Sequence, residues 1–484
     1  MVTIDTIIER LKSRNISEEK LEEVRKSYNL AKEIHKGQYR QSGEEYIIHP
    51  LNVAKNLLDI EVYDTDTICA ALLHDTIEDA PFDFTKEDVK KLVNETVSEL
   101  VDGVTKMRAM NYSTKVDCEL ANTRKIINGL NKDVRIILIK LCDRLHNMET
   151  LQYKRREKQK ENALETMELF VPLSLSIGAY QLKNKLEDLS LQYIEPDEFK
   201  KITEEKKKLE ELESPILKET GERINNTLIE NYIPSKIIYR TQTITSTYKR
   251  LKRGYKLENI YDLFYLKVLV GEIEDCYKSL GYVHRINPPI NGRFKDYIYN
   301  PRTNLYQSLH TTVSNSKGKL MKIKIRTYDM DKVAAYGIPA LWNIKGGKTM
   351  EETQKEVVKK CQFAKKLMEL DESFQDNHDF FKEIKKELLM EHIYVYTHKG
   401  EFIELPKGST ALDFACQVYP DMLDSMTGIL VNEKEVPLNT VLENWDRVQV
   451  TTKGIINHEN WEDYANSSVA KQKIRLLKKQ KEEK

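Results

Sequence analysis

The feature that most constrains the fold is a helical pattern of apolar residues that continues through the first 195 residues. Apolar side chains recur three and four residues apart, as in Ile4, Ile7, Ile8 and Leu11, and this spacing puts them on one face of a helix. The pattern predicts an all-helical domain over residues 1–195.

The sequence pattern changes after this domain. Residues 196–235 are highly charged and helical in pattern, so we interpret them as a helical linker. Two strand-like runs rich in β-branched and aromatic residues follow, Tyr261–Val270 and Leu320–Ile325. They predict an α+β domain over residues 236–346.

Three further segments complete the chain. Residues 347–390 return to a charged helical pattern and are expected to form a helical connector. Residues 391–453 contain short strand-like runs separated by turns, which predicts a small β-rich module. Residues 454–484 are expected to be a helical basic tail with a solvated, fraying end.

Composition excludes several classes of protein. The 484 residues leave room for two to four domains, and 77 basic residues balance 77 acidic ones, so nothing favours bulk binding to DNA or to a membrane. The six cysteines form no CxxC pair, which favours reduced, buried thiols. No apolar run approaches the roughly 18 residues of a membrane span. We expect a soluble, cytoplasmic protein.

Six residues of the helical part have the chemistry of a catalytic metal site: His49, His74, Asp75, Glu78, Asp79 and Asp143. The two histidines, Asp75 and Asp143 would form a nitrogen/oxygen ligand set that suits Mn or Fe at least as well as Zn. Glu78 and Asp79 follow Asp75 by three and four residues, the spacing of one face of a helix, and Pro81 is expected to end that helix. There the two acids could orient or deprotonate water.

A purely structural interpretation competes with this one. Each of these residues, taken singly, is more simply a helix-surface acid or a histidine satisfied in the core. Their order and helical spacing together favour a metal-dependent hydrolase. A further stretch supports it, because Asp143, Asn147 and Thr150 lie on one stripe of an expected helix, with His146 beside them.

The motifs around these residues resemble those of the long RelA/SpoT homologues, enzymes that make and degrade the alarmone (p)ppGpp in the stringent response. Four stretches carry the resemblance: RQSGEEYIIHP (40–50), ALLHDTIEDA (71–80), VDGVTK (101–106) and LCDRLHNMETL (141–151). The resemblance implies a multidomain protein with an all-α HD-type hydrolase domain, an α+β nucleotidyltransferase-like synthetase domain and a small β-grasp-like TGS module.

By that resemblance, the four metal ligands would hold Mn²⁺, and the two neighbouring acids would activate the water that attacks the 3′-pyrophosphate of (p)ppGpp. The products would be GDP or GTP and pyrophosphate. Departures from the family at Gln41, Glu149 and PLSLSIG (172–178) affect the nucleotide pocket or its support, not the metal ligands. The nucleotide-binding residues of this domain would be Arg40, Ser42, Asn147 and Thr150.

The synthetase resemblance rests on DCYKSLGYVH (275–284) and NGRFKDYIYNPRTNLYQSLHTTV (291–313). It implies transfer of pyrophosphate from ATP to GDP or GTP, with Mg²⁺ held by carboxylates. Lys322 stands where the family has its catalytic glutamate, and a lysine cannot bind Mg²⁺ or act as the same base. We therefore expect a degenerate synthetase, with Mg²⁺ relevant only if this domain is active. The residues of the degenerate site would be Asp262, Lys295, Tyr306, Gln307, His310 and Arg240.

Residues 392–415 resemble a TGS module, which in long family members contacts the 3′ end of uncharged tRNA. Tyr419 stands where the family has a histidine that helps to grip this end. The sequence therefore favours a regulatory role within the chain, and tRNA contact is kept as an alternative.

Three functions are compatible with the sequence. The first is a Mn²⁺-dependent (p)ppGpp hydrolase with an inactive synthetase domain, and the second is a bifunctional synthetase and hydrolase. The third is a non-catalytic guanine-nucleotide sensor, which requires the complete metal set to be vestigial. In each case the expected partners are guanine nucleotides, (p)ppGpp, GDP and GTP.

Overall fold

The computed structural model of the chain describes residues 2–80, 83–105, 121, 124–125, 132–299, 301, 306–315, 318–340, 392–443, 445–452, 460–467, 470–471, 473–475 and 477. The chain divides into two compact units, Met1–Lys385 and Lys386–Lys484. The expected helical connector over 347–390 lies outside the described residues.

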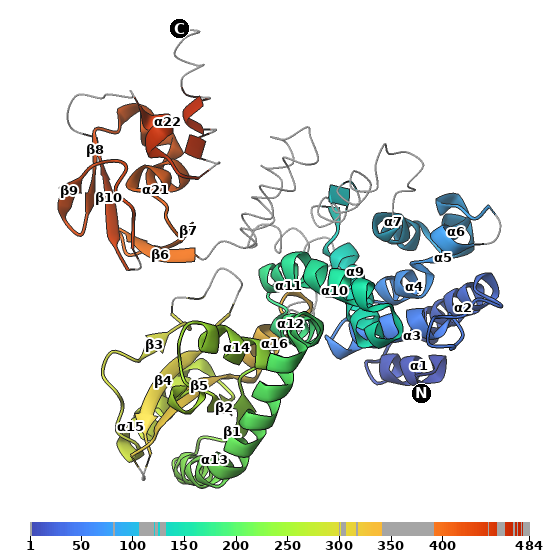
Figure 1. Cartoon of the computed structure of the whole chain (residues 1–484), viewed down its shortest axis with the longest axis horizontal. Helices are drawn as coiled ribbons and strands as arrows, with labels where there is room; N and C mark the ends of the chain where they lie inside the picture. Colours follow the sequence, from blue (N-terminus) through green and yellow to red (C-terminus); the bar gives the residue numbers. More distant parts are fainter. Residues whose placement is uncertain are drawn as a thin grey trace. The chain divides into compact units, whose positions relative to one another are not determined.

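The first part of the N-terminal unit is helical, as expected (Figure 1). Its core is made by α3, α4 and α9, whose side chains Leu57, Leu72 and Leu138 are fully buried. A π-helical segment, Thr166–Phe170, and a short 3₁₀ turn, Leu151–Tyr153, complete it. The helices are α1 (Ile4–Lys12), α2 (Glu18–Ile34), α3 (Ile48–Asp59), α4 (Thr65–Leu73), α5 (Thr76–Asp79), α6 (Lys86–Leu92), α7 (Glu95–Val104), α9 (Val134–Glu149), α10 (Arg156–Glu165), α11 (Val171–Ser176) and α12 (Tyr180–Ile194).

The expectation of one helix carrying His74 to Asp79 is wrong. Helix α4 ends at Leu73, and a turn at His74 and Asp75 separates it from α5, which begins at Thr76. Neighbouring residues of an unbroken helix point about 100° apart, so the break lets both His74 and Asp75 turn towards the same point. Pro81 lies outside the described residues.

The second part of the N-terminal unit is a five-stranded sheet in the order β1-β2-β5-β4-β3. Strands β2 and β5 are parallel and the other neighbours are antiparallel. The first expected strand begins at Phe264, since Tyr261 lies in a turn, and the second continues to Thr327. The elements are α13 (Pro196–Glu230), β1 (Lys236–Thr241), α14 (Ile244–Lys252), a 3₁₀ turn (Leu257–Asn259), β2 (Phe264–Val270), α15 (Ile273–Ile286), β3 (Lys295–Asp296), β4 (Leu309–Ser314), β5 (Leu320–Thr327) and α16 (Tyr328–Tyr336).

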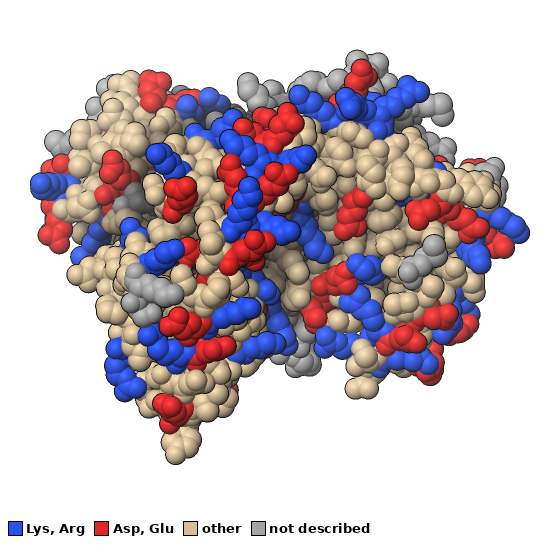
Figure 2. Space-filling view, turned by 60° about the horizontal axis from the view of Figure 1, so that its bottom comes forward, with Lys and Arg blue, Asp and Glu red and all other residues tan. Residues whose placement is uncertain are grey.

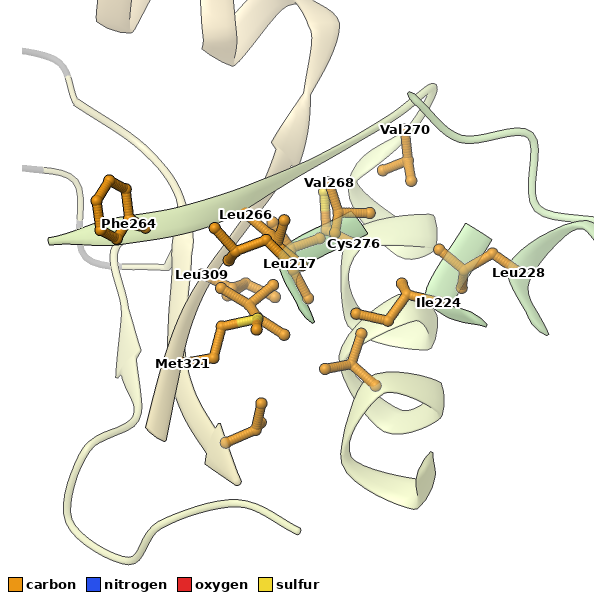
Figure 3. Packing of buried hydrophobic residues seen from close by; sticks show 14 of the residues in the cluster. Leu217, Ile224, Leu228, Phe264, Leu266, Val268, Val270, Cys276, Leu309 and Met321 are labelled. Atoms are coloured by element: carbon orange, nitrogen blue, oxygen red, sulfur yellow. The ribbon is translucent and has the colours of Figure 1, made fainter. Parts of the chain in front are cut away.

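Helices α13 and α15 cover one face of this sheet (Figure 1). Leu217 and Ile224 of α13 lie in the same apolar cluster as Leu266 of β2 (Figure 3). Side chains alternate between the two faces of a strand. The intervening positions of β5, Lys322 among them, therefore face the side of the sheet that these helices leave open.

Helix α12 of the helical part packs on α14 and α16 of the second part. The Asp188 carboxylate of α12 accepts a hydrogen bond from the backbone nitrogen of Thr245 at 2.9 Å, in the first turn of α14. At the end of α16, Gly337 has φ +68°, and an added Cβ would lie 2.2 Å from the carbonyl oxygen of Ile177. These contacts join the two parts into one unit.

The second unit is a five-stranded sheet in the order β7-β6-β10-β8-β9, with β6 and β10 parallel and α21 packed on it. This is the β-grasp-like arrangement that the sequence predicts. The expected solvated tail is wrong in part, because Trp461 and Ile474 are buried in this unit's core. The elements are β6 (His392–Thr397), β7 (Phe402–Pro406), α21 (Ala411–Val418), a 3₁₀ turn (Pro420–Ser425), β8 (Gly428–Val431), β9 (Lys434–Val436), β10 (Arg447–Thr451) and α22 (Trp461–Tyr464).

Three expectations from composition agree with the described residues. Basic and acidic side chains are interspersed over the face that Figure 2 shows, in keeping with the balanced charge of the chain. Among the described residues, no helix is long and apolar enough to cross a membrane. The described cysteines, Cys69, Cys142, Cys276 and Cys416, are buried free thiols.

Candidate metal centre

The four predicted metal ligands meet where α3, the end of α4 and the middle of α9 come together. The Nε2 atom of His49 lies 3.2 Å from Nε2 of His74 and 3.2 Å from Oδ1 of Asp143. Oδ2 of Asp75 lies 3.2 Å from Nε2 of His74 and 3.6 Å from that of His49. Both histidines are buried. One ligand atom from each of His49, His74 and Asp143 lies within 4.8 Å of the other two.

The hydrogen bonds behind the histidines direct their Nε2 lone pairs into this centre. Nδ1 of His74 lies 2.8 Å from the carbonyl oxygen of Ala71, which can only accept, so Nδ1 carries the proton and Nε2 is free to bind a cation. Nδ1 of His49 lies 2.8 Å from Nδ1 of His146. When His49 donates in this pair, its Nε2 also carries a lone pair.

These donors fit a divalent metal ion. Two imidazole lone pairs that face each other at 3.2 Å beside two carboxylates repel one another unless a proton or a cation lies between them. Two nitrogen and two oxygen donors without a thiolate are a ligand set for Mn, Fe or Zn. The buried cluster therefore has the composition and the convergence of a metal centre.

The surroundings keep the Asp143 carboxylate ionised and the His146 imidazole neutral. Burial alone would raise the pKa of Asp143, but the neighbouring His49 and the ammonium of Lys140 lower this pKa well below its usual value. Nζ of Lys140 lies 3.6 Å from Oδ2 of Asp143. Burial, together with His49 and Arg40, lowers the pKa of His146 to about 3. His146 is thus neutral and can accept a hydrogen bond from His49.

Three of the four predicted nucleotide-binding residues form one network beside the metal centre. Nη2 of Arg40 donates to Oδ1 of Asn147 at 2.9 Å and to Oγ1 of Thr150 at 3.4 Å. Asn147 in turn donates to Oδ1 of Asp143 at 2.6 Å, so it orients a metal ligand. Ser42 lies in the loop after Arg40 and hydrogen-bonds Glu44 at 3.1 Å.

The two predicted water-activating acids lie on α5, directly after the ligand Asp75. The backbone nitrogens of Glu78 and Asp79 both donate to the carbonyl oxygen of Asp75, at 3.1 and 2.9 Å. The Glu78 side chain is half-buried and that of Asp79 is exposed. Both acids are therefore fixed within one turn of a ligand, at the outer side of the centre.

The sequence interpretation gave no role to three residues of this site. Tyr46 donates its hydroxyl to Oδ2 of Asp75 at 2.8 Å and thereby holds that carboxylate in place. Lys140 and His146 support Asp143 and His49, as described above. Their spacing was a usable signal, since Lys140 and His146 stand three residues before and after Asp143 on one helix.

The second predicted site lies on the open face of the α+β sheet, where a cavity of about 680 Å³ is found. Arg240, Lys295, Tyr306 and His310 line this cavity. Gln307 does not belong to the lining, and its side-chain nitrogen donates to the carbonyl oxygen of Ile298 at 3.3 Å. The structure therefore brings together most, not all, of the residues expected here.

The aspartate expected to bind Mg²⁺ in this domain is engaged by two cations. Nζ of Lys322 lies 3.2 Å from Oδ2 of Asp262. Arg250 contacts both carboxylate oxygens of Asp262. Burial by itself would raise the pKa of Asp262. The ion pairs with Arg250 and Lys322 outweigh burial, so the pKa lies below its usual value and the carboxylate is ionised. Both cations thus pair with the carboxylate that the sequence assigned to Mg²⁺.

Comparison with protein-family models assigns three domains to the chain. Residues 27–179 match an HD domain, residues 239–349 match the region found in RelA / SpoT proteins, and residues 393–452 match a TGS domain. These matches define the class, an HD-domain protein joined to a RelA/SpoT-type domain and a TGS domain.

Curated relatives match along nearly the whole chain. A guanosine-3′,5′-bis(diphosphate) 3′-pyrophosphohydrolase of Aquifex aeolicus is 38% identical over 96% of this chain and 65% of its own length. A GTP pyrophosphokinase of Myxococcus xanthus is 36% identical over 96% of this chain and 61% of its own length. The bifunctional (p)ppGpp synthase/hydrolase SpoT of Escherichia coli is 35% identical over 96% of this chain and 66% of its own length.

The chain belongs to the RelA/SpoT family. It spans just under two thirds of the length of these relatives. Their names cover hydrolysis, synthesis and both activities together, so the choice between these reactions depends on the two sites described above.

Proposed function

We propose that this protein removes the 3′-pyrophosphate of (p)ppGpp by metal-dependent hydrolysis, giving GDP or GTP and pyrophosphate. The observation that carries the proposal is the convergence of the two histidine Nε2 atoms with Asp75 and Asp143, each ligand held by its own hydrogen bond or ion pair. Two relatives named for this hydrolysis support it. We propose Mn²⁺ as the metal, because the donors include no thiolate.

A bound divalent ion would supply Lewis acidity to the phosphoryl group and to the attacking water. The residues of the chain perform the remaining work. Water attacks the phosphorus bonded to O3′, the bond from phosphorus to O3′ breaks, and O3′ takes up a proton to become the 3′-hydroxyl of GDP or GTP while pyrophosphate is released. Glu78, with Asp79 beside it, takes the proton that water loses, which balances the proton that O3′ takes up; work of this kind typically contributes about 10²–10⁴-fold. The guanidinium of Arg40 is held by Asn147 and Thr150, where it can pair with an anionic nucleotide.

We further propose that the second domain does not synthesise (p)ppGpp. Pyrophosphoryl transfer from ATP requires carboxylates that hold Mg²⁺ and a base for the attacking hydroxyl. Here Lys322 replaces the expected glutamate and pairs with Asp262. Binding of Mg²⁺ at Asp262 would have to break this ion pair and place a dication beside an ammonium. The bifunctional alternative requires Mg²⁺ to bind at Asp262 despite this ion pair.

A protein that only senses guanine nucleotides has no need of a complete set of metal ligands, so this set favours an enzyme over a sensor. The proposed partners are therefore (p)ppGpp as substrate and GDP or GTP as product.

For the TGS module we propose a role within the chain. Tyr419, which replaces the histidine that grips tRNA, lies against Phe414 with a ring separation of 6.1 Å.

The test is to incubate the purified chain with Mn²⁺ and ppGpp and to identify the products. We expect GDP and pyrophosphate in equal amounts. His74→Ala and Glu78→Ala should each abolish the reaction, whereas the matched changes His284→Ala and Glu274→Ala, both on α15, should leave it intact. Full activity of His74→Ala, or release of single phosphates, would contradict the assignment.

A further inference from the structure

The cavity on the open face of the α+β sheet is unusually cationic. Nine lysine and arginine side chains line it, against a single carboxylate, that of Asp331. Six tyrosines also line it, among them Tyr306. A concave site with this excess of positive charge attracts a polyanion, and tyrosines beside it can hold an aromatic base.

The cations at the centre of this cavity are poorly compensated. Lys324 of β5 is half-buried and lies over the ring of Tyr265, 4.2 Å from its centre, and no ion pair joins it to a carboxylate of the described residues. Arg326 is buried and pairs through Nη2 with Asp331, while its Nε and Nη1 atoms are buried without a hydrogen-bond partner. Buried charge of this kind is costly without a counter-ion.

Lys322 changes what this cavity can accept. It stands beside Lys324 and Arg326 on the same face of β5, and together with Arg250 it pairs with Asp262, a buried carboxylate next to the cavity lining. A divalent cation would meet an ammonium here in place of a free carboxylate. A phosphate chain without a metal ion would meet an array of lysine and arginine donors.

We propose that this cavity binds a nucleoside polyphosphate in its metal-free form, with the ammonium of Lys322 in the place of a divalent cation. This binding is not a step of a transfer reaction, and it is independent of the hydrolase centre. The tyrosines select for a nucleoside, because inorganic polyphosphate offers them no ring to stack on.

The test is titration of the full chain with GTP by calorimetry, once in EDTA and once in excess Mg²⁺. We expect binding in EDTA that is at least as tight as in Mg²⁺, since a metal ion neutralises part of the phosphate charge. EDTA also strips metal from the hydrolase centre. Inorganic triphosphate, which has no base, should bind at least roughly tenfold more weakly than GTP.

The substitution Lys322→Glu should reverse the metal dependence. It restores a carboxylate beside Asp262, so binding in EDTA should weaken by at least roughly tenfold and Mg²⁺ should restore it. The matched change Lys278→Glu, on exposed α15 outside the cavity, should leave both affinities unchanged. Lys322→Met removes the charge without adding another, so it should weaken binding in EDTA without creating a Mg²⁺ requirement.

Several results would overturn the proposal. One is binding of GTP to the unaltered chain only when Mg²⁺ is present, and another is no binding in either condition. Equal affinities for GTP and inorganic triphosphate would show that the cavity does not recognise the nucleoside. Unchanged binding in EDTA after both Lys322 substitutions would show that the ligand lies elsewhere.

Discussion

At the scale of single residues, the metal centre depends on side chains that do not touch the metal. His146 fixes the tautomer of His49. A neutral His146 accepts a hydrogen bond from Nδ1 of His49, so the proton stays on Nδ1 and the lone pair of Nε2 faces the centre. Tyr46 and Asn147 hold the two carboxylates in the same way, each through one hydrogen bond. Such supporting partners typically affect metal affinity by about 10–100-fold.

Removal of His146 should therefore weaken metal binding before it affects the fold. We expect His146→Ala to lower the Mn²⁺ affinity about 10–100-fold, measured by competition with a chromophoric chelator. His146→Gln keeps an acceptor and should recover part of the loss. His284→Ala, which removes a histidine from the other domain, serves as the control. Unchanged Mn²⁺ affinity in His146→Ala would show that the pair with His49 has no such role.

Lys324 gives the second cavity a dependence on pH. Burial, with help from the cations around it, lowers its pKa to about 7. A bound polyphosphate favours the charged ammonium and raises this pKa, so affinity is complete below about pH 7 and falls as the pH rises above it. The charged groups that face Lys324 from β5, β2 and the turn before β2 are Lys322, Arg326, Lys267 and Asp262.

This linkage predicts that GTP binding at pH 8 takes up a proton. The measurement is calorimetry in two buffers with different ionisation enthalpies. The apparent binding enthalpy should differ between the buffers in the unaltered chain and become equal in Lys324→Met. Equal enthalpies in the unaltered chain would contradict the assignment to Lys324.

The sequence was sufficient to select the four candidate ligands but not the residues that support them. His49, His74, Asp75 and Asp143 are named by motif and spacing, and the structure brings all four together. The ion pair between Lys322 and Asp262 joins residues that lie 60 positions apart. Such a contact depends on how β5 packs beside β2, which no local pattern contains.

At the scale of elements, the break between α4 and α5 is the main departure from the sequence prediction. The pattern of apolar residues continues through it, so periodicity alone predicts one helix. In the structure the turn between the two helices places the side chains of His74 and Asp75 at one point, with Oδ2 of Asp75 3.2 Å from Nε2 of His74. In α9, by contrast, the spacing in the sequence agrees with the structure. The expected stripe of Asp143, Asn147 and Thr150 lies at one side of the metal centre.

Helix α12 packs both beside the candidate metal centre and beside the second cavity. It packs on α9, which carries Asp143, and its residues Tyr180 and Lys183 line the cavity. Glu187 of α12 is buried and pairs with Lys249 of α14 at 2.8 Å. This helix therefore contacts both functional regions of the N-terminal unit.

The contact between α12 and α14 can be tested through Asp188. Its carboxylate accepts hydrogen bonds from the backbone nitrogen and the hydroxyl of Thr245, at 2.9 and 2.7 Å, and so caps the start of α14. Loss of such a cap costs about 0.5–2 kcal/mol. Asp188→Ala should therefore raise the hydrogen-exchange rate of the first turn of α14, measured by mass spectrometry. Glu204→Ala, on exposed α13, should leave it unchanged, and an unchanged rate in Asp188→Ala would contradict the capping role.

At the scale of the whole molecule, the chain combines one complete site with one altered site. The candidate metal centre brings together all four predicted ligands with their supporting partners, whereas in the α+β domain Lys322 pairs with the Asp262 carboxylate. The sequence predicts three domains with their fold classes, because each has its own periodicity of apolar residues. The contacts of α12 with the second domain appear only in the structure.

The most direct test of this account is a paired assay on one preparation. The unaltered chain is incubated with Mn²⁺ and ppGpp, and the His74→Ala variant is incubated with Mg²⁺, ATP and GDP, so that any ppGpp formed is not degraded. The account predicts complete conversion to GDP and pyrophosphate in the first reaction and no ppGpp in the second. Formation of ppGpp in the second reaction, or an unchanged substrate in the first, would contradict it.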